Sequence, residues 1–109
     1  MFRGLWVDGI RGRWFVSYPA DPDTAFLRCT RGYESDTAGG YTAIDPTYRH
    51  FGAYQFLQST WNNVARRTGL TYLVGVNPAH ASHADQDFLA LYLFRWQGAS
   101  HWQGRCANT

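Results

Sequence analysis

The sequence predicts a small, mainly helical α+β domain with a short irregular β-hairpin region and a buried C-terminal helix. Helix start and stop signals recur along the chain, turn residues alternate with β-favouring ones over residues 36–54, and an apolar run fills residues 88–94. A chain of 109 residues can enclose one modest core but not two. Residues 21–109 are therefore assigned to one domain, and residues 1–20 to an N-terminal arm of unknown role.

The first helix is expected to begin at Asp21 and to end near Ser35. An aspartate can cap the free N–H groups of a first turn, and the proline that follows suits the first helical position. The arm before it mixes glycine, arginine and aromatic residues, with an expected strand over residues 14–18. The buried stripe expected on this helix is Phe26, Cys29 and Tyr33.

Residues 36–54 carry the expected hairpin, which the turn residues place around Asp45 and Pro46. A second helix follows, with Ser59 as its expected cap and Gly69 as its stop. The side chains expected to face inward from this helix are Trp61, Val64 and Ala65.

The last helix is expected from Ser82 to about Gln97. Ser82 and Asp85 resemble a capping box in which an aspartate stands where glutamate or glutamine is usual. The helix is apolar nearly all round, so it belongs at the centre of the domain, and a glycine ends it. Asp85, Gln86 and Asp87 are assigned a structural role, because negative side chains stabilise the positive end of a helix.

The charge pattern disfavours nucleic acid as a partner. The net charge is +2, lysine is absent, and ten arginines are scattered along the chain without a run, whereas nucleic-acid binding favours a clustered basic stripe. The longest apolar run is far shorter than the roughly eighteen residues of a membrane span. Residues 1–15 lack the uninterrupted apolar segment of a signal peptide, so no such peptide is visible.

The two cysteines, Cys29 and Cys106, lie 77 positions apart. That separation fits no metal or redox motif but allows one bridge between the first helix and the C-terminus. Such a bridge would stabilise the fold by up to about 4 kcal/mol in the chain-entropy model and would indicate an oxidising compartment. Two buried free thiols are the alternative.

Glu34 is the only glutamate of the chain and is expected at the end of the first helix. A carboxylic acid in an apolar or crowded setting can protonate the leaving oxygen of a glycoside, and a long side chain can reach from a helix end into a cleft. The alternative is an ordinary surface ion pair with Arg31, worth less than about 1 kcal/mol. Such a pair would oppose the acid role, because it favours the charged carboxylate.

Three blocks of sequence stand in order between about Phe26 and Cys106: CTRGYESDTAGGYTAID, FGAYQFLQSTW and ADQDFLALYLFRWQGASHWQGRC. Together they resemble the resuscitation-promoting factors and related transglycosylase-like domains of actinobacteria. The resemblance implies a small lysozyme-like fold that cleaves peptidoglycan at the β-1,4 bond between N-acetylmuramic acid and N-acetylglucosamine. It also implies that Glu34 is the catalytic acid and that Cys29 is bridged to Cys106.

The resemblance further implies a set of glycan-binding residues. Gln55 closes a Gly-x-x-Gln element that begins at Gly52 and is expected to hydrogen-bond the sugar at the cleft floor, while Thr60 is expected to help hold it. From the residues alone, the aromatic side chains expected along the groove are Tyr41, Tyr48, Tyr54 and Trp102. Trp61 is interpreted as core.

A second carboxylate is available in Asp36 or Asp45, but both lie among turn residues, where an aspartate more often bonds its own backbone. The resemblance implies a single-acid scheme instead. In this scheme Glu34 protonates the glycosidic oxygen and then, as a base, helps the muramic acid 6-hydroxyl to form a 1,6-anhydro product. Attack by water would make the same site a muramidase, and both outcomes stay open.

No metal or cofactor is expected, because the four histidines, two of them at positions 80 and 83, have no cysteine or acidic companion in a zinc spacing. The expected partner is the glycan strand of peptidoglycan, met by a monomer that is secreted to the cell wall; a phage-borne lysin fits the same residues. One alternative is a catalytically silent glycan-binding or signalling module on the same fold. The other is an interaction domain whose aromatic residues only fill a core.

Overall fold

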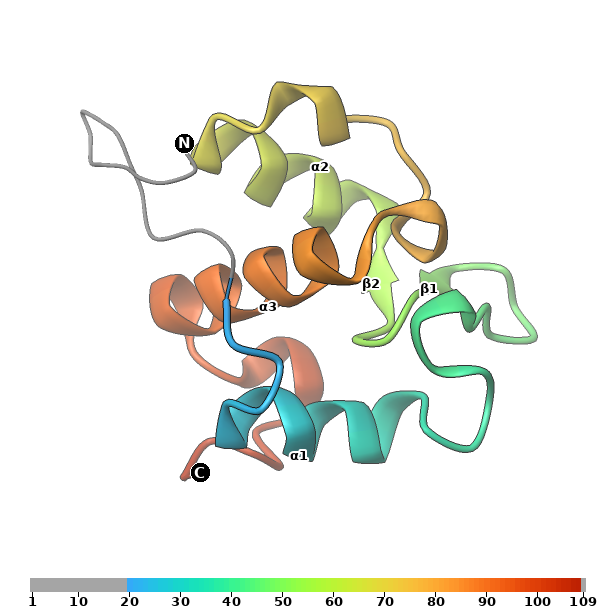
Figure 1. Cartoon of the computed structure of the whole chain (residues 1–109), viewed down its shortest axis with the longest axis vertical. Coiled ribbons are helices and arrows are strands. Elements are labelled where there is room, and N and C mark those ends of the chain that lie inside the picture. The colour runs from blue at the N-terminus through green and yellow to red at the C-terminus, as the bar shows by residue number, and fades with distance from the viewer. Residues whose placement is uncertain (1–19, 109) are drawn as a thin grey trace.

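The structure, a computed structural model, describes residues 20–108 (Figure 1). Among these residues it has three α-helices, one two-stranded sheet and four short 3-10 helices, which confirms the predicted mainly helical α+β class. The N-terminal arm and its expected strand at 14–18 lie outside the described residues, apart from Ala20. The elements are α1 Ala25–Glu34, η1 Gly40–Thr42, β1 His50–Phe51, β2 Phe56–Leu57, α2 Gln58–Thr68, η2 Thr71–Leu73, η3 Pro78–His80, α3 His83–Gln97 and η4 Ser100–Trp102.

Helix α3 lies at the centre, with α1 on one side of it and α2 on the other (Figure 1). Because its sequence is apolar nearly all round, burial on several faces removes the most apolar surface from water. Leu89, Ala90 and Leu93 are almost completely buried, which confirms the predicted central helix. None of the helices within residues 20–108 has the length and hydropathy to cross a membrane.

Both ends of α3 agree with the prediction. The hydroxyl of Ser82 accepts the backbone N–H of Asp85 at 3.0 Å, which satisfies one of the free donors of the first turn. At the other end Gly98 follows Gln97 with a positive φ of 77°, and its N–H still bonds the carbonyl of Phe94. The cap and the stop are therefore confirmed.

Helix α1 begins at Ala25, later than predicted. The carboxylate of Asp21 accepts the N–H of Asp23 at 2.9 Å, and the Asp21 carbonyl accepts the N–H of Thr24 at 3.0 Å. Asp21 thus closes a separate turn, and the prediction that it caps the helix is wrong because this local bonding competes with capping. The helix ends at Glu34, next to the predicted end.

The buried face of α1 also differs from the predicted stripe. Phe26 is buried, but it is accompanied by Leu27 and Thr30. Tyr33 is 62% exposed, so its predicted burial is wrong. At this end of the helix the neighbouring group is the guanidinium of Arg105, which lies 4.8 Å from the centre of the Tyr33 ring.

Helix α2 begins earlier than predicted and has no side-chain cap. Strand β2 runs directly into it at Leu57, so Ser59 lies inside the first turn and the prediction of Ser59 as the cap is wrong. The stop at Gly69 is confirmed, since this residue adopts a left-handed φ of 78°. The three side chains predicted to face inward, Trp61, Val64 and Ala65, are fully buried.

The hairpin joins β1 to β2, with Phe51 opposite Phe56 in the antiparallel register. Its turn is formed by residues 52–55, one turn later along the chain than predicted. The predicted position at Asp45 instead begins the preceding loop, which Ile44 closes by a single antiparallel bridge to Phe51. The region is therefore short and irregular, as expected, but has two successive reversals of the chain.

One disulfide joins Cys29 of α1 to Cys106 near the C-terminus, as predicted. It holds the segment after α3 against α1, and the ring of Trp102 in that segment lies 5.3 Å from the ring of Phe26. Phe26 in turn stacks on Phe94 of α3. The C-terminal segment is thus part of the core.

Candidate active site

The hairpin turn that begins at Gly52 is held by a side chain of α3. The amide of Gln86 accepts the N–H of Ala53 at 2.8 Å and donates to the carbonyls of Tyr41 and Ala81. Gly52 has a φ of +81°, and a Cβ added there would lie 2.4 Å from Gln86 Oε1. Only glycine fits this position, because any side chain would meet both the strained backbone and the buried amide.

Glu34 is the last residue of α1, and its side chain is mostly buried, with 17% of its surface exposed. The residue that follows ties the helix end to the hairpin turn, since the hydroxyl of Ser35 donates to the carbonyl of Ala53 at 2.7 Å. Gln55 closes the same turn. The sequence therefore brings Glu34 and Gln55 into one region through the end of α1 and the turn.

The carboxylate of Glu34 forms an ion pair with the guanidinium of Arg105. The predicted alternative partner, Arg31, donates instead to the hydroxyl of Tyr54 and to the carbonyl of Pro22, both at 2.8 Å. That alternative is wrong in its partner, although Glu34 is paired. The sequence analysis did not identify Arg105. Its position directly before Cys106, which is bridged to α1, indicates that it lies near that helix.

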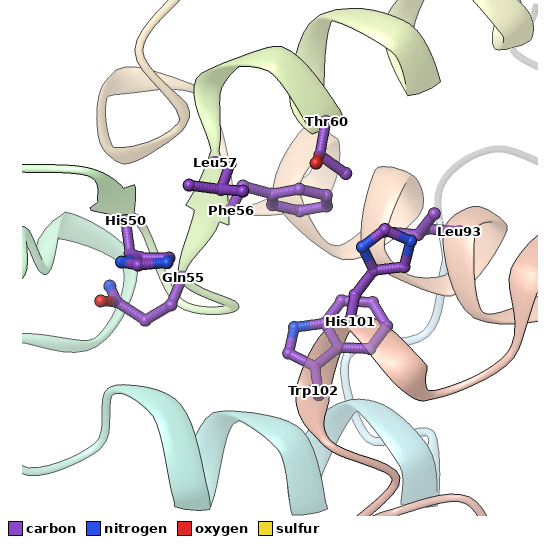
Figure 2. Close-up of a pocket in the computed structure, with 8 residues that line it drawn as sticks. All are labelled: His50, Gln55, Phe56, Leu57, Thr60, Leu93, His101 and Trp102. Carbon is purple, nitrogen blue, oxygen red and sulfur yellow. The ribbon is translucent and has the colours of Figure 1, made fainter.

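A small pocket opens between β2, the start of α2 and η4 (Figure 2). Three predicted glycan-binding residues, Gln55, Thr60 and Trp102, line it together. Two of the four histidines, His50 and His101, line it as well. Figure 2 shows His50 and Gln55 at one end of the pocket and His101 at the other.

Backbone contacts connect this pocket to Glu34. The indole Nε1 of Trp102 donates to the carbonyl of Tyr54 at 2.8 Å, so the pocket wall is fixed to the same hairpin turn. The N–H of Arg105 bonds the carbonyl of Trp102, which places the partner of Glu34 in the turn that follows the pocket wall. The carboxylate and the pocket are thus built from shared segments.

The two polar residues predicted to bind glycan keep free hydrogen-bonding groups. Gln55 donates from Nε2 to the carbonyl of Gly52 at 2.9 Å, which fixes its side chain. Within residues 20–108 no hydrogen bond engages its Oε1 or the hydroxyl of Thr60. Both groups can therefore bind a polar ligand in the pocket.

The aromatic residues have unequal access to solvent. Tyr54 is fully buried, which disagrees with its predicted place along the groove. Its hydroxyl donates to Asp87, and burial raises its pKa well above the ordinary value. Trp102 is 4% exposed and forms a wall of the pocket from inside the core. Trp61 is fully buried and donates to the carbonyl of Leu73, which confirms the core interpretation.

Tyr41 is partly exposed but is not among the residues that line the pocket. Its hydroxyl donates to Asp87 at 2.7 Å, and its ring stacks on His83 with centroids 3.8 Å apart. Burial, with the nearby Asp87 carboxylate, raises the pKa of Tyr41 to about 12. Its predicted contact with glycan stays a prediction.

The candidate second carboxylates are placed differently. Asp36 is exposed. Asp45 accepts the backbone N–H groups of Arg49 and His50 at 3.0 and 3.2 Å and the hydroxyl of Thr47 at 2.8 Å. Its other contact is Nδ1 of His50 at 2.7 Å. Loss of hydration acts to raise the pKa of Asp45, but the hydrogen bonds, first that from His50, hold it well below the ordinary value.

No group of three metal-ligating side chains occurs among the described residues. The polar partner of Glu34 is a guanidinium, and the polar groups that line the pocket are an amide, a hydroxyl and two imidazoles. These groups can donate or accept protons and bind hydroxyl-rich ligands.

The fold and this site define a small, mainly helical domain with one glutamate at a helix end and a polar pocket, joined through the hairpin turn and the C-terminal segment. A sequence model of the transglycosylase-like domain family matches residues 34–106, which run from Glu34 to the bridged Cys106. The chain belongs to this family, as the three sequence blocks predict.

Among curated proteins, the chain is similar to "Probable transglycosylase SceD" of Staphylococcus aureus strains Newman and USA300. In both cases the identity is 41% over 69 residues, which cover 63% of this chain and 28% of the relative. The chain therefore spans little more than a quarter of the length of these relatives. No solved structure matches it significantly.

Proposed function

We propose that this domain is a peptidoglycan-cleaving lytic transglycosylase that cuts the β-1,4 bond between N-acetylmuramic acid and N-acetylglucosamine. The observation that carries the proposal is the position of Glu34, the only glutamate, at the end of α1 and tied through Ser35 to the turn of Gln55. Membership of the transglycosylase-like family and similarity to a protein named as a probable transglycosylase support it.

In the proposed reaction the protonated carboxyl of Glu34 donates its proton to the glycosidic oxygen, and the bond between that oxygen and C1 of N-acetylmuramic acid breaks. The carboxylate left on Glu34 then takes the proton of the 6-hydroxyl as its oxygen attacks C1. The product is a 1,6-anhydro sugar, the acid is regenerated, and no water is consumed. If water attacks C1 instead, the same residues perform hydrolysis.

The ion pair with Arg105 has to be reconciled with this role. An adjacent positive charge favours the ionised carboxylate, whereas the first step requires the protonated one. Arg105 is therefore proposed to leave the Glu34 oxygen when a glycan strand occupies the site. Its position allows this movement, because its side chain is 34% exposed and it follows Gln103 and Gly104, both with positive φ in an exposed turn.

The remaining residues are proposed to hold the glycan. The free amide oxygen of Gln55 and the hydroxyl of Thr60 would bind sugar hydroxyl or amide groups, and Trp102 would form a wall of their pocket. A substrate of this kind places the enzyme outside the cell or in the cell wall, where a disulfide is also expected to persist. We propose that the domain acts there as a monomer.

The test is mass spectrometry of isolated cell-wall sacculi after digestion with the wild type and with Glu34→Gln. We expect anhydro-ended fragments from the wild type and a loss of at least about a hundredfold in rate for the variant, because only the transferable proton has been removed. Near wild-type cleavage by Glu34→Gln would remove Glu34 from the role. Hydrated ends in place of anhydro ends would assign the muramidase reaction.

The pair between Glu34 and Arg105 also favours a second candidate, a catalytically silent glycan-binding or signalling module. A carboxylate held permanently by arginine binds but does not donate a proton. This candidate predicts retention of the protein on sacculi without any new sugar ends. The same digestion distinguishes it from the enzyme, since it counts cleaved bonds directly.

A further inference from the structure

His50 lies in the pocket but has no part in the mechanism above. It is the first residue of β1, and its pairing with Leu57 of β2 fixes its backbone. The side chain remains 43% exposed and lines the same pocket as Gln55 and Thr60 (Figure 2). An imidazole held in place and open to solvent at a polar pocket is available to a ligand.

The partner of His50 determines which ring nitrogen is available. Nδ1 lies 2.7 Å from Oδ2 of Asp45, a distance that requires one proton between them. Asp45 also accepts hydrogen bonds from Thr47 and from two backbone N–H groups, and these hold the carboxylate in its ionised form. Because an ionised carboxylate can only accept, the proton resides on Nδ1. In neutral His50, Nε2 then carries the lone pair.

The contact is not needed to close the loop of residues 45–50. The Asp45 N–H already bonds the His50 carbonyl at 3.0 Å, and Asp45 Oδ1 already accepts the N–H of Arg49. The imidazole is an additional partner, bound through Oδ2. The contact between Asp45 and His50 therefore determines the orientation of the imidazole and is not what shapes the loop.

His101, the other histidine of the pocket, is a useful contrast. Its Nε2 is already within 2.8 Å of the side-chain oxygen of Gln97. Within residues 20–108, by comparison, no hydrogen bond engages Nε2 of His50. Because the amide oxygen of Gln97 can only accept, Nε2 of His101 is its protonated nitrogen. The free acceptor is therefore Nε2 in His50 and Nδ1 in His101.

We propose that His50 is a glycan-binding residue, whose Nε2 accepts a hydrogen bond from a sugar hydroxyl in the pocket, and that Asp45 is the positioning residue that fixes its tautomer. The ligand class is a chain of β-1,4-linked N-acetylated hexosamines, so this inference rests on the function proposed above. It gives Asp45 a role other than that of a second catalytic carboxylate.

The direct test uses nuclear magnetic resonance of the ring nitrogens in protein labelled with 15N at histidine, in the Glu34→Gln background so that the ligand is not cleaved. Before ligand, the His50 signals should identify Nδ1 as protonated and Nε2 as the unprotonated nitrogen. Addition of the tetrasaccharide of alternating N-acetylglucosamine and N-acetylmuramic acid should shift the Nε2 signal. An unchanged Nε2 signal after full addition of the tetrasaccharide would overturn the inference.

Kinetics on sacculi give an independent readout in the active protein. His50→Ala should raise KM about three- to tenfold, the effect of one lost neutral hydrogen bond, with a smaller change in kcat. His50→Gln, which offers an amide oxygen, should restore part of the affinity. Asp45→Asn should change KM in the same direction, whereas Thr47→Ala removes a hydrogen bond to the same carboxylate without touching the imidazole and should keep the wild-type KM.

A cooperative thermal unfolding transition is the check that each variant is folded. The His50 contact and the catalytic function are then tested by different outcomes. If wild-type protein cleaves sacculi and His50→Ala has an unchanged KM, the role of His50 is refuted while the enzyme stands. If wild-type protein releases no fragments but the tetrasaccharide shifts the Nε2 signal, the glycan contact stands and the catalytic function is refuted.

Discussion

Glu34 stands between two contacts that act on it in opposite ways. The hydrogen bond from Ser35 to Ala53 fixes the helix end next to the hairpin turn, while Arg105 forms an ion pair with its carboxylate. In the proposed mechanism the first contact would position the side chain for proton transfer, and the second would oppose it, because a guanidinium stabilises the carboxylate that does not donate. The proposed activity would therefore depend on how readily Arg105 leaves the Glu34 carboxylate.

Replacing Arg105 tests that dependence. Arg105→Gln removes the positive charge and should increase cleavage of sacculi near neutral pH by up to about fivefold, because a partly exposed ion pair contributes about 1 kcal/mol at most. Arg105→Lys keeps the charge and is the matched control, with a rate close to that of the wild type. A loss of activity in Arg105→Gln alone would mean that the guanidinium binds substrate instead of restraining Glu34.

Thr60 provides a second test at this scale. Thr60→Ala should weaken transition-state binding by about 0.5–1.5 kcal/mol through loss of one hydrogen bond, which is seen as a reduced kcat/KM. Thr60→Ser retains the hydroxyl and should retain most of the activity. If Thr60→Ser is as slow as Thr60→Ala, the methyl group and its packing, not the hydroxyl, carry the effect.

The sequence predicted part of the candidate site. Gln55 of the Gly-x-x-Gln element and Thr60, both indicated by the resemblance, do line one pocket, because they lie close together along the chain at the hairpin and the start of α2. The prediction of Tyr54 along the groove is wrong, because aromatic character alone does not distinguish a core residue from a groove residue. The partner of its hydroxyl, Asp87, is 33 residues away in the sequence. Arg105 is 71 residues from Glu34, and only tertiary folding brings the two together.

At the scale of elements, the start of α3 organises the region around the site. Asp87 accepts hydrogen bonds from the hydroxyls of Tyr41 and Tyr54, and Arg31 of α1 donates to Tyr54. Gln86 holds the hairpin turn in the same way. The predicted structural role of these residues holds, but it is exerted through contacts with other elements and not only through the helix end.

Gly52→Ala tests the fit between the hairpin turn and α3. The new Cβ would lie 2.4 Å from Gln86 Oε1 at a φ of +81°, so the free energy of unfolding should fall by about 1–3 kcal/mol. Gly32→Ala is the matched control within α1, where a Cβ meets nothing within 4 Å, and it should stabilise the helix by about 0.5–1 kcal/mol. Chemical denaturation measures both, and equal effects would contradict the proposed packing.

The raised pKa values of Tyr41 and Tyr54, which both donate to Asp87, predict a loss of stability at alkaline pH. The folded state holds the pKa of Tyr41 at about 12, raised chiefly by burial, whereas an unfolded tyrosine ionises near pH 10. Between these values the unfolded chain binds fewer protons than the folded one. The free energy of unfolding should therefore be unaffected by this group below about pH 10 and should fall as the pH rises toward 12. The pKa of Tyr54 is also raised by burial, so its ionisation lowers the free energy of unfolding in the same direction.

Denaturation at a series of pH values from 8 to beyond 11 checks this. In Tyr41→Phe the group that releases the proton is absent, so the alkaline fall should be shallower than in the wild type. Parallel curves for the two proteins would show that Tyr41 does not contribute. Because the described cysteines are all bridged, thiol ionisation does not contribute to the same range.

The ends of elements were predictable where one residue decides them. Ser82 caps α3 and Gly69 stops α2, since each acts on its own turn of helix. The predicted caps at Asp21 and Ser59 are wrong, because aspartate and serine also suit a turn or the first turn of a helix. The residues before and after them determine which of these structures forms. The position of the hairpin was missed for a related reason, since the Gln86 contact that fixes its turn comes from a distant helix.

At the scale of the whole molecule, the disulfide connects stability to the site. It joins Cys29 and Cys106 across 77 positions, and the segment it holds contains both Trp102, a wall of the pocket, and Arg105, the partner of Glu34. The count and spacing of the two cysteines allow the bridge, and the resemblance to the family implies it. Its consequence for the site depends on which residues precede Cys106, and this emerged only from the fold.

Replacing both cysteines by alanine should therefore change stability and catalysis together. The free energy of unfolding should fall by about 4 kcal/mol at most, the loop-closure entropy that the bridge removes from the unfolded chain. Below the melting temperature, cleavage of sacculi should also decrease, because Trp102 and the pocket wall lose their tether to α1. Reduction of the wild type by dithiothreitol should reproduce both effects. Full activity in a variant that is clearly less stable would show that the core contacts of Trp102 hold the pocket without the bridge.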